Sequence, residues 1–383
     1  MLRFDIYKKT NRCATFLTLV ASLFITLFFV QSSFGASVNK SSQFPLIIMG
    51  GHWSVSPRSG GYSDLSRVCA VGFTHAFSYF TEPMLESEIT LEGAIASVVD
   101  FASTVKKNCP GMGLVIGIPR IWIYEENLDL IADYISGINA KNIAVDYWYS
   151  DEIIHEMVNL KNIKLEEAKR RARRAIEAVE KISSVPYIWN EPGNYNPSLS
   201  LVLDALSDLP AGIKAYDEYI ISRTGRLAKS QDGFSRLLKT LNRLKYKGNI
   251  VYPICEINNL KNVAPTEEEL AAISISLLMN GADGLIFYEE RWTTVEILQS
   301  LKKIMRVITC LNETGVNSFV RTNDTITSWE TKSGKRTIKV VLNTTGKSVN
   351  LTELLPKHSI IVWPSPSFVH KLEPMNLLVF YYE

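Results

Sequence analysis

The sequence predicts an α/β fold, a (β/α)8 TIM barrel followed by a small all-β sandwich domain. Apolar segments of strand character alternate with segments of helical periodicity along most of the chain. After about residue 315, short alternating segments separated by Gly, Ser and Pro replace that pattern, as in antiparallel sheets. Parallel strands need helical crossovers, and eight such units close without an exposed edge. We therefore assign residues 44–314 to a barrel domain and residues 315–383 to a β-sandwich domain.

The predicted barrel strands recur along the chain at residues 45–53, 72–80, 113–119, 142–150, 185–192, 212–219, 249–256 and 281–289. The segments between them have helical spacing of apolar residues, for example residues 91–107. Another predicted helix, residues 266–279, begins with a Thr at the N-cap and Glu in its first turn.

Residues 1–36 have the composition of a signal peptide or an N-terminal membrane anchor. Lys8, Lys9 and Arg12 precede an uncharged apolar run at residues 14–30, and small residues follow it. The run is long for a signal peptide and just short of an average membrane-spanning helix. We expect a secreted or extracellular protein, with membrane anchoring through this segment as the alternative.

Overall composition fits a globular enzyme. The 383 residues are 46% hydrophobic, and the formal net charge is +2. The densest basic cluster, residues 169–174, lies in a helical pattern of alternating acidic and basic residues, which is typical of a solvated helix face. No nucleic-acid partner is therefore predicted.

Four cysteines follow the N-terminal segment, at positions 69, 109, 255 and 310. The first and last units of a closed barrel are neighbours, so we predict a Cys69–Cys310 disulfide. Cys255 lies in a predicted strand and is expected to be a buried free thiol. The Cys and His spacings match no metal-binding pattern, so neither a metal site nor a cofactor is predicted. Glycosylation sequons at Asn39, Asn312, Asn323, Asn343 and Asn350 favour a glycosylated, exported protein.

The fifth predicted strand carries the clearest functional motif. Its apolar residues end abruptly at Asn190 and Glu191, which would emerge at the C-terminal rim, where barrels of this type keep their active sites. Trp189-Asn190-Glu191-Pro192 resembles the Asn-Glu-Pro signature of clan A glycoside hydrolases. That resemblance implies that Glu191 is the general acid/base and that Asn190 binds a sugar 2-hydroxyl. The alternative is a solvated Glu at the start of a loop.

The end of the barrel and the C-terminal part add to the resemblance. Gly281-Ala282-Asp283-Gly284, an apolar strand and then Arg291-Trp292 resemble the eighth unit of many sugar-hydrolysing barrels, which implies that Trp292 floors the subsite of the reacting sugar. The C-terminal segments resemble the β-sandwich that follows many glycosidase barrels.

Glycoside hydrolysis needs two carboxyl groups, and several predicted strand ends supply one. The candidates are Asp146, Asp151, Glu152, Glu191, Asp217, Glu218, Glu256, Glu289 and Glu290. In clan A the Asn-Glu pair lies on the fourth strand and the nucleophile on the seventh, whereas Glu191 lies on the fifth predicted strand. Three partners for Glu191 stay open: Glu256 first, then Asp146 in the arrangement of alpha-amylase-type barrels, then Glu289.

Aromatic residues at predicted strand ends suit stacking against sugar rings. We expect Trp53, Trp148, Trp189 and Trp292 to bind substrate by such stacking. Arg120 and Glu152, which follow the third and fourth predicted strands, are further candidates for substrate binding. The predicted function is an exported glycoside hydrolase that cleaves O-glycosidic bonds of an oligosaccharide or polysaccharide by a two-carboxylate mechanism. The alternative is a non-catalytic carbohydrate-binding barrel.

Overall fold

The computed structural model describes residues 44–50, 65–78, 90–193, 200–221, 225–227, 231–257, 264–288, 294–314, 320–323, 326–364 and 370–382. The predicted signal or anchor segment, residues 1–36, lies outside these ranges. Within them, no helix combines the length and the apolar character needed to cross a membrane.

Eight parallel strands form a closed barrel in chain order, with β1 hydrogen-bonded to β8. They are β1 (Leu46–Gly50), β2 (His75–Ser78), β3 (Gly113–Gly117), β4 (Tyr147–Asp151), β5 (Tyr187–Pro192), β6 (Ile213–Asp217), β7 (Ile250–Glu256) and β8 (Leu285–Tyr288). The predicted fold class is confirmed. The fourth strand begins five residues later than expected, at Tyr147, which changes the residues found at its two ends.

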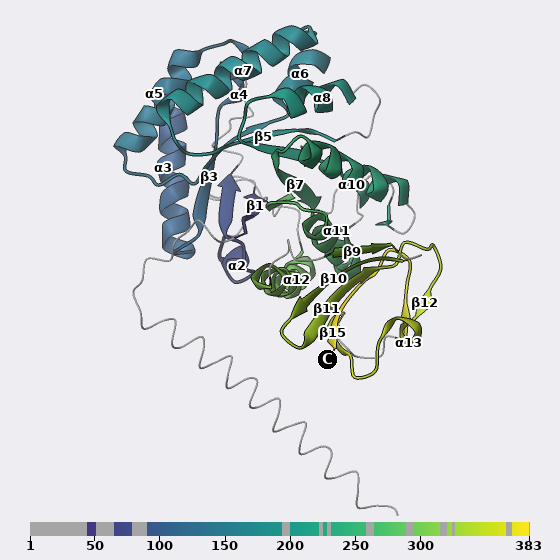
Figure 1. Cartoon of the computed structure of the whole chain (residues 1–383). Coiled ribbons are helices and arrows are strands. Elements are labelled where there is room, and N and C mark those ends of the chain that lie inside the picture. The colour runs from purple at the N-terminus through teal and green to yellow at the C-terminus, as the bar shows by residue number, and fades with distance from the viewer. Residues whose placement is uncertain are drawn as a thin grey trace, which may run out of the picture. The chain divides into compact units, whose positions relative to one another are not determined.

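Helices lie around the outside of the barrel (Figure 1). They are α2 (Leu65–Cys69), α3 (Leu91–Asn108), α4 (Arg120–Tyr124), α5 (Leu128–Ala140), α6 (Ile153–Asn159), α7 (Leu165–Ile182), α8 (Ser200–Asp208), α10 (Gln231–Tyr246), α11 (Glu267–Met279) and α12 (Val295–Glu313). The expected Thr N-cap of α11 is present, because Thr266 and Glu269 form a reciprocal capping box.

Side chains of each barrel strand alternate between two separate cores. One core fills the barrel interior and includes Met49, Phe77, Ile188 and Ile254. The other lies between the strands and the surrounding helices and includes Trp148 and Trp189. Both faces of every strand are therefore buried, as expected for a parallel barrel.

Close packing at the N-terminal end of the interior requires glycine. A Cβ atom at Gly113 would lie 2.3 Å from the His75 ring, and one at Gly284 would lie 2.8 Å from the Tyr252 ring. Tyr147 and Tyr252 meet there with their hydroxyl oxygens 3.4 Å apart. Side chains thus fill the N-terminal end of the barrel interior. An active site is therefore expected at the C-terminal end.

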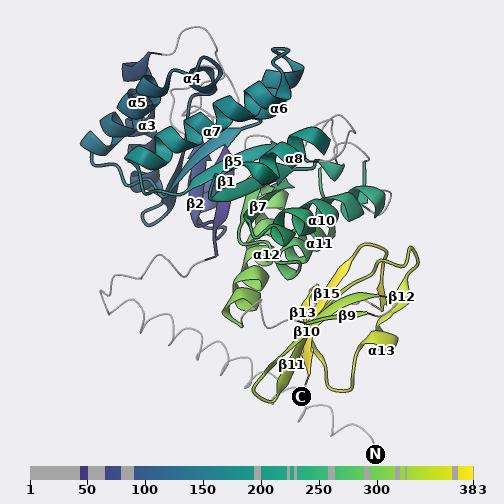
Figure 2. The same ribbon diagram turned by 45° about the horizontal axis from the view of Figure 1, so that its top comes forward.

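The C-terminal part of the described chain consists of β-strands, as predicted, with one short helix between them. An antiparallel sheet in the order β13-β15-β11-β10-β9 accompanies a two-stranded sheet, β12-β14. The elements are β9 (Val320–Asn323), β10 (Thr327–Ser333), β11 (Arg336–Leu342), β12 (Val349–Asn350), α13 (Leu351–Leu354), β13 (Ile360–Trp363), β14 (Lys371–Leu372) and β15 (Leu377–Tyr382). Figure 2 shows this region in green and yellow after α12. Trp329 and Trp363 join the same core as the barrel helices.

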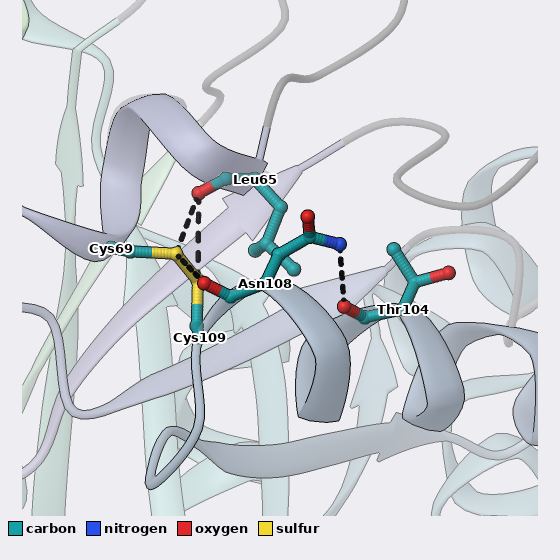
Figure 3. Close-up of a disulfide and its surroundings, with 5 residues drawn as sticks. All are labelled: Leu65, Cys69, Thr104, Asn108 and Cys109. Atoms are coloured by element: carbon teal, nitrogen blue, oxygen red, sulfur yellow. Dashed lines mark hydrogen bonds between the residues drawn. A yellow bond between two sulfur atoms is a disulfide. The ribbon is translucent and has the colours of Figure 1, made fainter.

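The predicted Cys69–Cys310 disulfide is wrong. Cys69 is bridged to Cys109, with the two Cα atoms 5.4 Å apart, while Cys310 is a free, exposed thiol. Cys69 ends α2 and Cys109 follows the last residue of α3, so two successive outer helices are joined at their C-terminal ends (Figure 3). The expectation for Cys255 is confirmed, because it is free and buried in β7.

Candidate active site

The C-terminal ends of the barrel strands bring several acidic residues to one rim. Asp151 ends β4, Asp217 ends β6 and Glu256 ends β7. Each continues the alternating series that fills the barrel interior, after Tyr149, Ala215 and Ile254 respectively. The three carboxylates therefore belong to the inner side of the barrel, at the end where active sites of this fold lie.

Asp151 is held by two donors from the barrel interior. The side-chain amide of Asn190 donates to Asp151 Oδ1 over 2.7 Å, and the hydroxyl of Tyr149 donates to the same oxygen over 3.0 Å. Asn190 pairs with Asp151 across β4 and β5 and is almost fully buried. Within the described part of the chain, its own Oδ1 is buried without a hydrogen-bond partner. An acceptor at this rim can bind a hydroxyl group that enters the barrel mouth.

Glu152 has the electrostatics of a proton donor. The pKa of Glu152 is raised to about 10, mainly by burial and then by the nearby charges of Asp217, Asp151, Glu191 and Glu156, in that order. Its backbone is left-handed, with φ of 51°, which is uncommon for a residue with a Cβ atom. A carboxyl group that keeps its proton at neutral pH beside other carboxylates is the arrangement that general acids need.

Two tyrosines complete the inner rim. Tyr219 and Tyr288 have ring centroids 5.4 Å apart. Burial raises the pKa of Tyr219, and the charges of Asp217, Asp151 and Glu152 add to the effect. These acids and the tyrosine thus share one low-dielectric site. Glu256 Oε2 also accepts a hydrogen bond from the backbone N–H of Ile221, over 3.1 Å.

Glu191 is not among the inner carboxylates. It is fully buried on the outer side of β5, where its Oε1 accepts from the backbone N–H of Ile154 over 2.8 Å and from the Trp189 indole over 2.8 Å. Its Oε2 accepts from the backbone N–H of His155 over 3.0 Å. Burial raises the pKa of Glu191 to about 8, although the three donors act to lower it. Of the Asn-Glu pair, only Asn190 reaches the interior.

The structure corrects the expected position of Asp146. This residue precedes β4 and lies at the N-terminal end of the barrel, where its Oδ2 accepts from the backbone N–H of Leu114 over 2.8 Å. The predicted strand was displaced toward the N-terminus, so Asp146 was expected too close to the rim. Asp151 occupies the rim position of β4 instead.

Trp148, Trp189 and Arg120 also lie outside the barrel interior. Both indoles are fully buried between strands and helices, and Trp148 donates to Ser183 Oγ over 3.0 Å. Neither ring is a platform for a sugar. Arg120 begins α4 and pairs with Glu156 of α6, to which Tyr124 also donates. Trp53, Trp292 and Glu289 lie outside the described residues.

Asp151, Asp217, Tyr219 and Tyr288 were missed as site residues, although both aspartates were weighed as candidates. The signal that could have found Asp151 is its place two residues before an amphipathic segment, residues 153–159, because the end of a barrel strand lies shortly before the following helix. Among the residues that the structure describes, no group of three or more His, Cys, Asp or Glu side chains could hold a metal ion.

Comparison with known proteins shows the fold. No protein-family model and no curated protein matches the sequence. Solved structures do match: the alpha-amylase from Geobacillus thermoleovorans complexed with acarbose has a TM-score of 0.51 at 10% identity, over 89% of this chain and 98% of that one. The alpha-amylase from H. orenii has a TM-score of 0.53 at 9% identity, over 88% and 99%. A cyclic maltosyl-maltose hydrolase from Arthrobacter globiformis has a TM-score of 0.50 at 10% identity, over 89% and 99%.

Proposed function

We propose that this protein is an exported glycoside hydrolase that acts on an oligosaccharide or polysaccharide at the C-terminal rim of its barrel. The observation that carries the proposal is Glu152, a carboxyl group that burial keeps protonated beside Asp217 and Asp151. Glycoside hydrolysis requires one protonated and one ionised carboxyl group at the same site. Structures of the same fold include an alpha-amylase complexed with acarbose, which supports a carbohydrate ligand.

We assign the general-acid role to Glu152, with Asp217 as the partner carboxylate and Glu256 as the second candidate for that partner. Asp217 exerts the strongest charge effect on Glu152, and both residues follow or end strands on the inner side of the rim. Glu152 protonates the leaving glycosidic oxygen, while the partner attacks the anomeric carbon or activates water. Asn190 and Asp151 bind a sugar hydroxyl, and Tyr219 and Tyr288 form one wall.

Export rests on two independent features. Residues 1–36 have the charge and apolar pattern of a targeting segment. The Cys69–Cys109 disulfide is the kind of bond that persists in oxidising compartments. The sequence of the apolar run is compatible with either cleavage or anchoring.

The test is a screen of aryl glycosides and polysaccharides with the purified protein. With a substrate in hand, Glu152→Gln should lose hydrolysis of sugars with poor leaving groups by about 10²- to 10⁴-fold, while activated aryl glycosides retain much of their rate. Asp217→Asn should lose both. Glu218→Gln is the matched control, because Glu218 adjoins Asp217 but pairs with Arg236 over 3.0 Å. Binding without hydrolysis would favour the carbohydrate-binding alternative, and the absence of both would overturn the proposal.

A further inference from the structure

The start of α6 has no capping hydrogen bond from its own N-cap side chain. Glu152 is the N-cap residue, and its side chain makes no hydrogen bond to the first turn. The first backbone N–H groups of a helix have no partner within the helix and normally take one from the N-cap side chain. Here the N–H groups of Ile154 and His155 donate to Glu191 on the neighbouring strand. Glu191 thus performs the capping that Glu152 does not.

A second contact ties Glu152 itself to β5. Its backbone N–H donates to the carbonyl oxygen of Asn190 over 2.9 Å, and its own carbonyl accepts from the N–H of Glu156 over 2.9 Å. Consecutive residues of β5 therefore hold this junction on both sides, because Asn190 binds the backbone of Glu152 and Glu191 binds the first turn of α6 that follows it. This clamp holds a left-handed backbone that a non-glycine residue adopts only when its surroundings impose it.

We infer that Glu191 is a positioning residue, which caps α6 in place of Glu152 and so leaves the Glu152 carboxyl group free to face Asp217 inside the rim. This inference rests on the proposed function of that site. The Trp189 indole, which donates to the same Glu191 oxygen as Ile154, fixes the carboxylate from the other side. The Asn-Glu pair of β5 thus acts on both faces of the strand, with Asn190 inward and Glu191 outward.

The role of Glu191 differs from that of a proton donor in a measurable way. The charges that act on Glu152 come from Asp217 on β6, Asp151 on β4, Glu191 on β5 and Glu156 on α6. Glu191 is ionised above its own pKa of about 8, and removing that charge lowers the pKa of Glu152. In the Glu191→Gln variant, the rate should still fall at high pH as Glu152 loses its proton, but this fall should begin at a lower pH than in the wild type. Removing a proton donor would abolish this fall in rate at high pH.

The experiment compares Glu191→Gln with Glu218→Gln, a change of another buried carboxylate, which directly follows the next strand, β6. In Glu191→Gln, one amide N–H must face a backbone N–H, so at least one capping bond is lost. We expect kcat to fall about 10- to 100-fold with KM little changed, since small displacements of a catalytic group cost rates of this order. Glu218→Gln should leave kcat and the profile as in the wild type.

Carbon-13 titration of the glutamate carboxyl groups, assigned with Glu152→Gln, gives a readout that does not need activity. Glu152 should titrate at lower pH in Glu191→Gln than in the wild type, and the amides of Ile154 and His155 should exchange faster. If Glu191→Gln fails to fold, Trp189→Phe can replace it. This variant should shift the Glu152 titration and the amide exchange in the same direction, but by less. Unchanged titration and exchange would overturn the inference, as would the loss of the fall in rate at high pH. A wild-type protein without hydrolysis would refute the proposed function, while the titration would still decide the role of Glu191.

Discussion

The side-chain amide of Asn190 donates to Asp151 Oδ1 across the β4–β5 pair, and this bond lies inside the barrel rim. Asn190→Ala removes that donor and leaves Asp151 with the Tyr149 hydroxyl. Losing a hydrogen bond to a charged group costs about 1.5–3 kcal/mol. We expect kcat/KM to fall about 10- to 100-fold, to be measured on the best substrate of the screen. Tyr149→Phe should cause a smaller loss, and unchanged kinetics in Asn190→Ala would remove this pair from the site.

The pH dependence of activity should follow the Asp217 charge. Asp217 is the first of the charges that raise the pKa of Glu152 above its ordinary value of 4.5. In Asp217→Asn, Glu152 should lose its proton at lower pH than in the wild type, because the largest charge effect on its pKa is removed. The carboxyl titration of Glu152 measures this directly. A Glu152 titration at the wild-type pH would show that the two groups do not interact.

Stability should decrease as the pH rises from about 4.5 to about 8. Glu191 has an ordinary pKa of 4.5 in the unfolded chain and a pKa of about 8 in the folded protein. The folded state therefore binds more protons between these values, and its stability falls with increasing pH. Glu191→Gln removes this contribution, which is at most about 1.4 kcal/mol per pH unit. Denaturant unfolding at several pH values should give a shallower decline for the variant, and an identical decline would contradict the assigned pKa.

The sequence predicts the strands of this barrel better than the faces of those strands. Trp189 and Ile188 are both apolar because both sides of a parallel barrel strand are buried, so the pattern does not reveal which side is the interior. A shift of one residue moves a side chain to the other face. Asn190 and Glu191 were therefore assigned to one site, although the structure places them on opposite faces. The predicted start of β4 was too early in the chain, so Asp146 was ranked as the catalytic candidate of this strand instead of Asp151.

The disulfide shows a related limit. Sequence reasoning joined the first and last barrel units, which a closed barrel does bring together. It did not consider that α2 and α3, the first two outer helices, are neighbours as well and that each has a cysteine at its C-terminal end, Cys69 as the last residue of α2 and Cys109 directly after α3. Connectivity among four cysteines depends on such packing, which spacing alone does not define.

Removing the Cys69–Cys109 bridge should lower stability. The bridge closes a loop with a sequence separation of 40 residues, for which chain entropy gives about 4 kcal/mol. The free energy of unfolding of the double variant Cys69→Ser/Cys109→Ser should be lower by about 4 kcal/mol. The variant should therefore unfold at a lower denaturant concentration than the wild type. Cys310→Ser is the control, because this thiol is free and exposed. Peptide mapping without reduction should recover the Cys69–Cys109 peptide, and recovery of a Cys69–Cys310 peptide instead would contradict the structure.

Asn343 should remain unglycosylated, although it lies in one of the predicted sequons. Its side chain is fully buried, and its Nδ2 donates to the carbonyl oxygens of Lys347 and Leu372 over 2.8 and 2.7 Å. Its Oδ1 accepts from the backbone N–H and the hydroxyl of Thr345. A glycan on Nδ2 would displace these bonds and could not reach solvent.

Glycopeptide mass spectrometry of protein secreted from a eukaryotic host checks this expectation, with the exposed Asn350 as the internal comparison. Asn343→Ala should lower the free energy of unfolding by about 1–3 kcal/mol, because it leaves the buried carbonyl group of Leu372 without its donor. Asn350→Ala, whose side chain contacts only the exposed Glu353 carboxylate among the described hydrogen bonds, should be within about 0.5 kcal/mol of the wild type. A glycan at Asn343 of the folded protein would show that the turn at residues 343–347 is built differently.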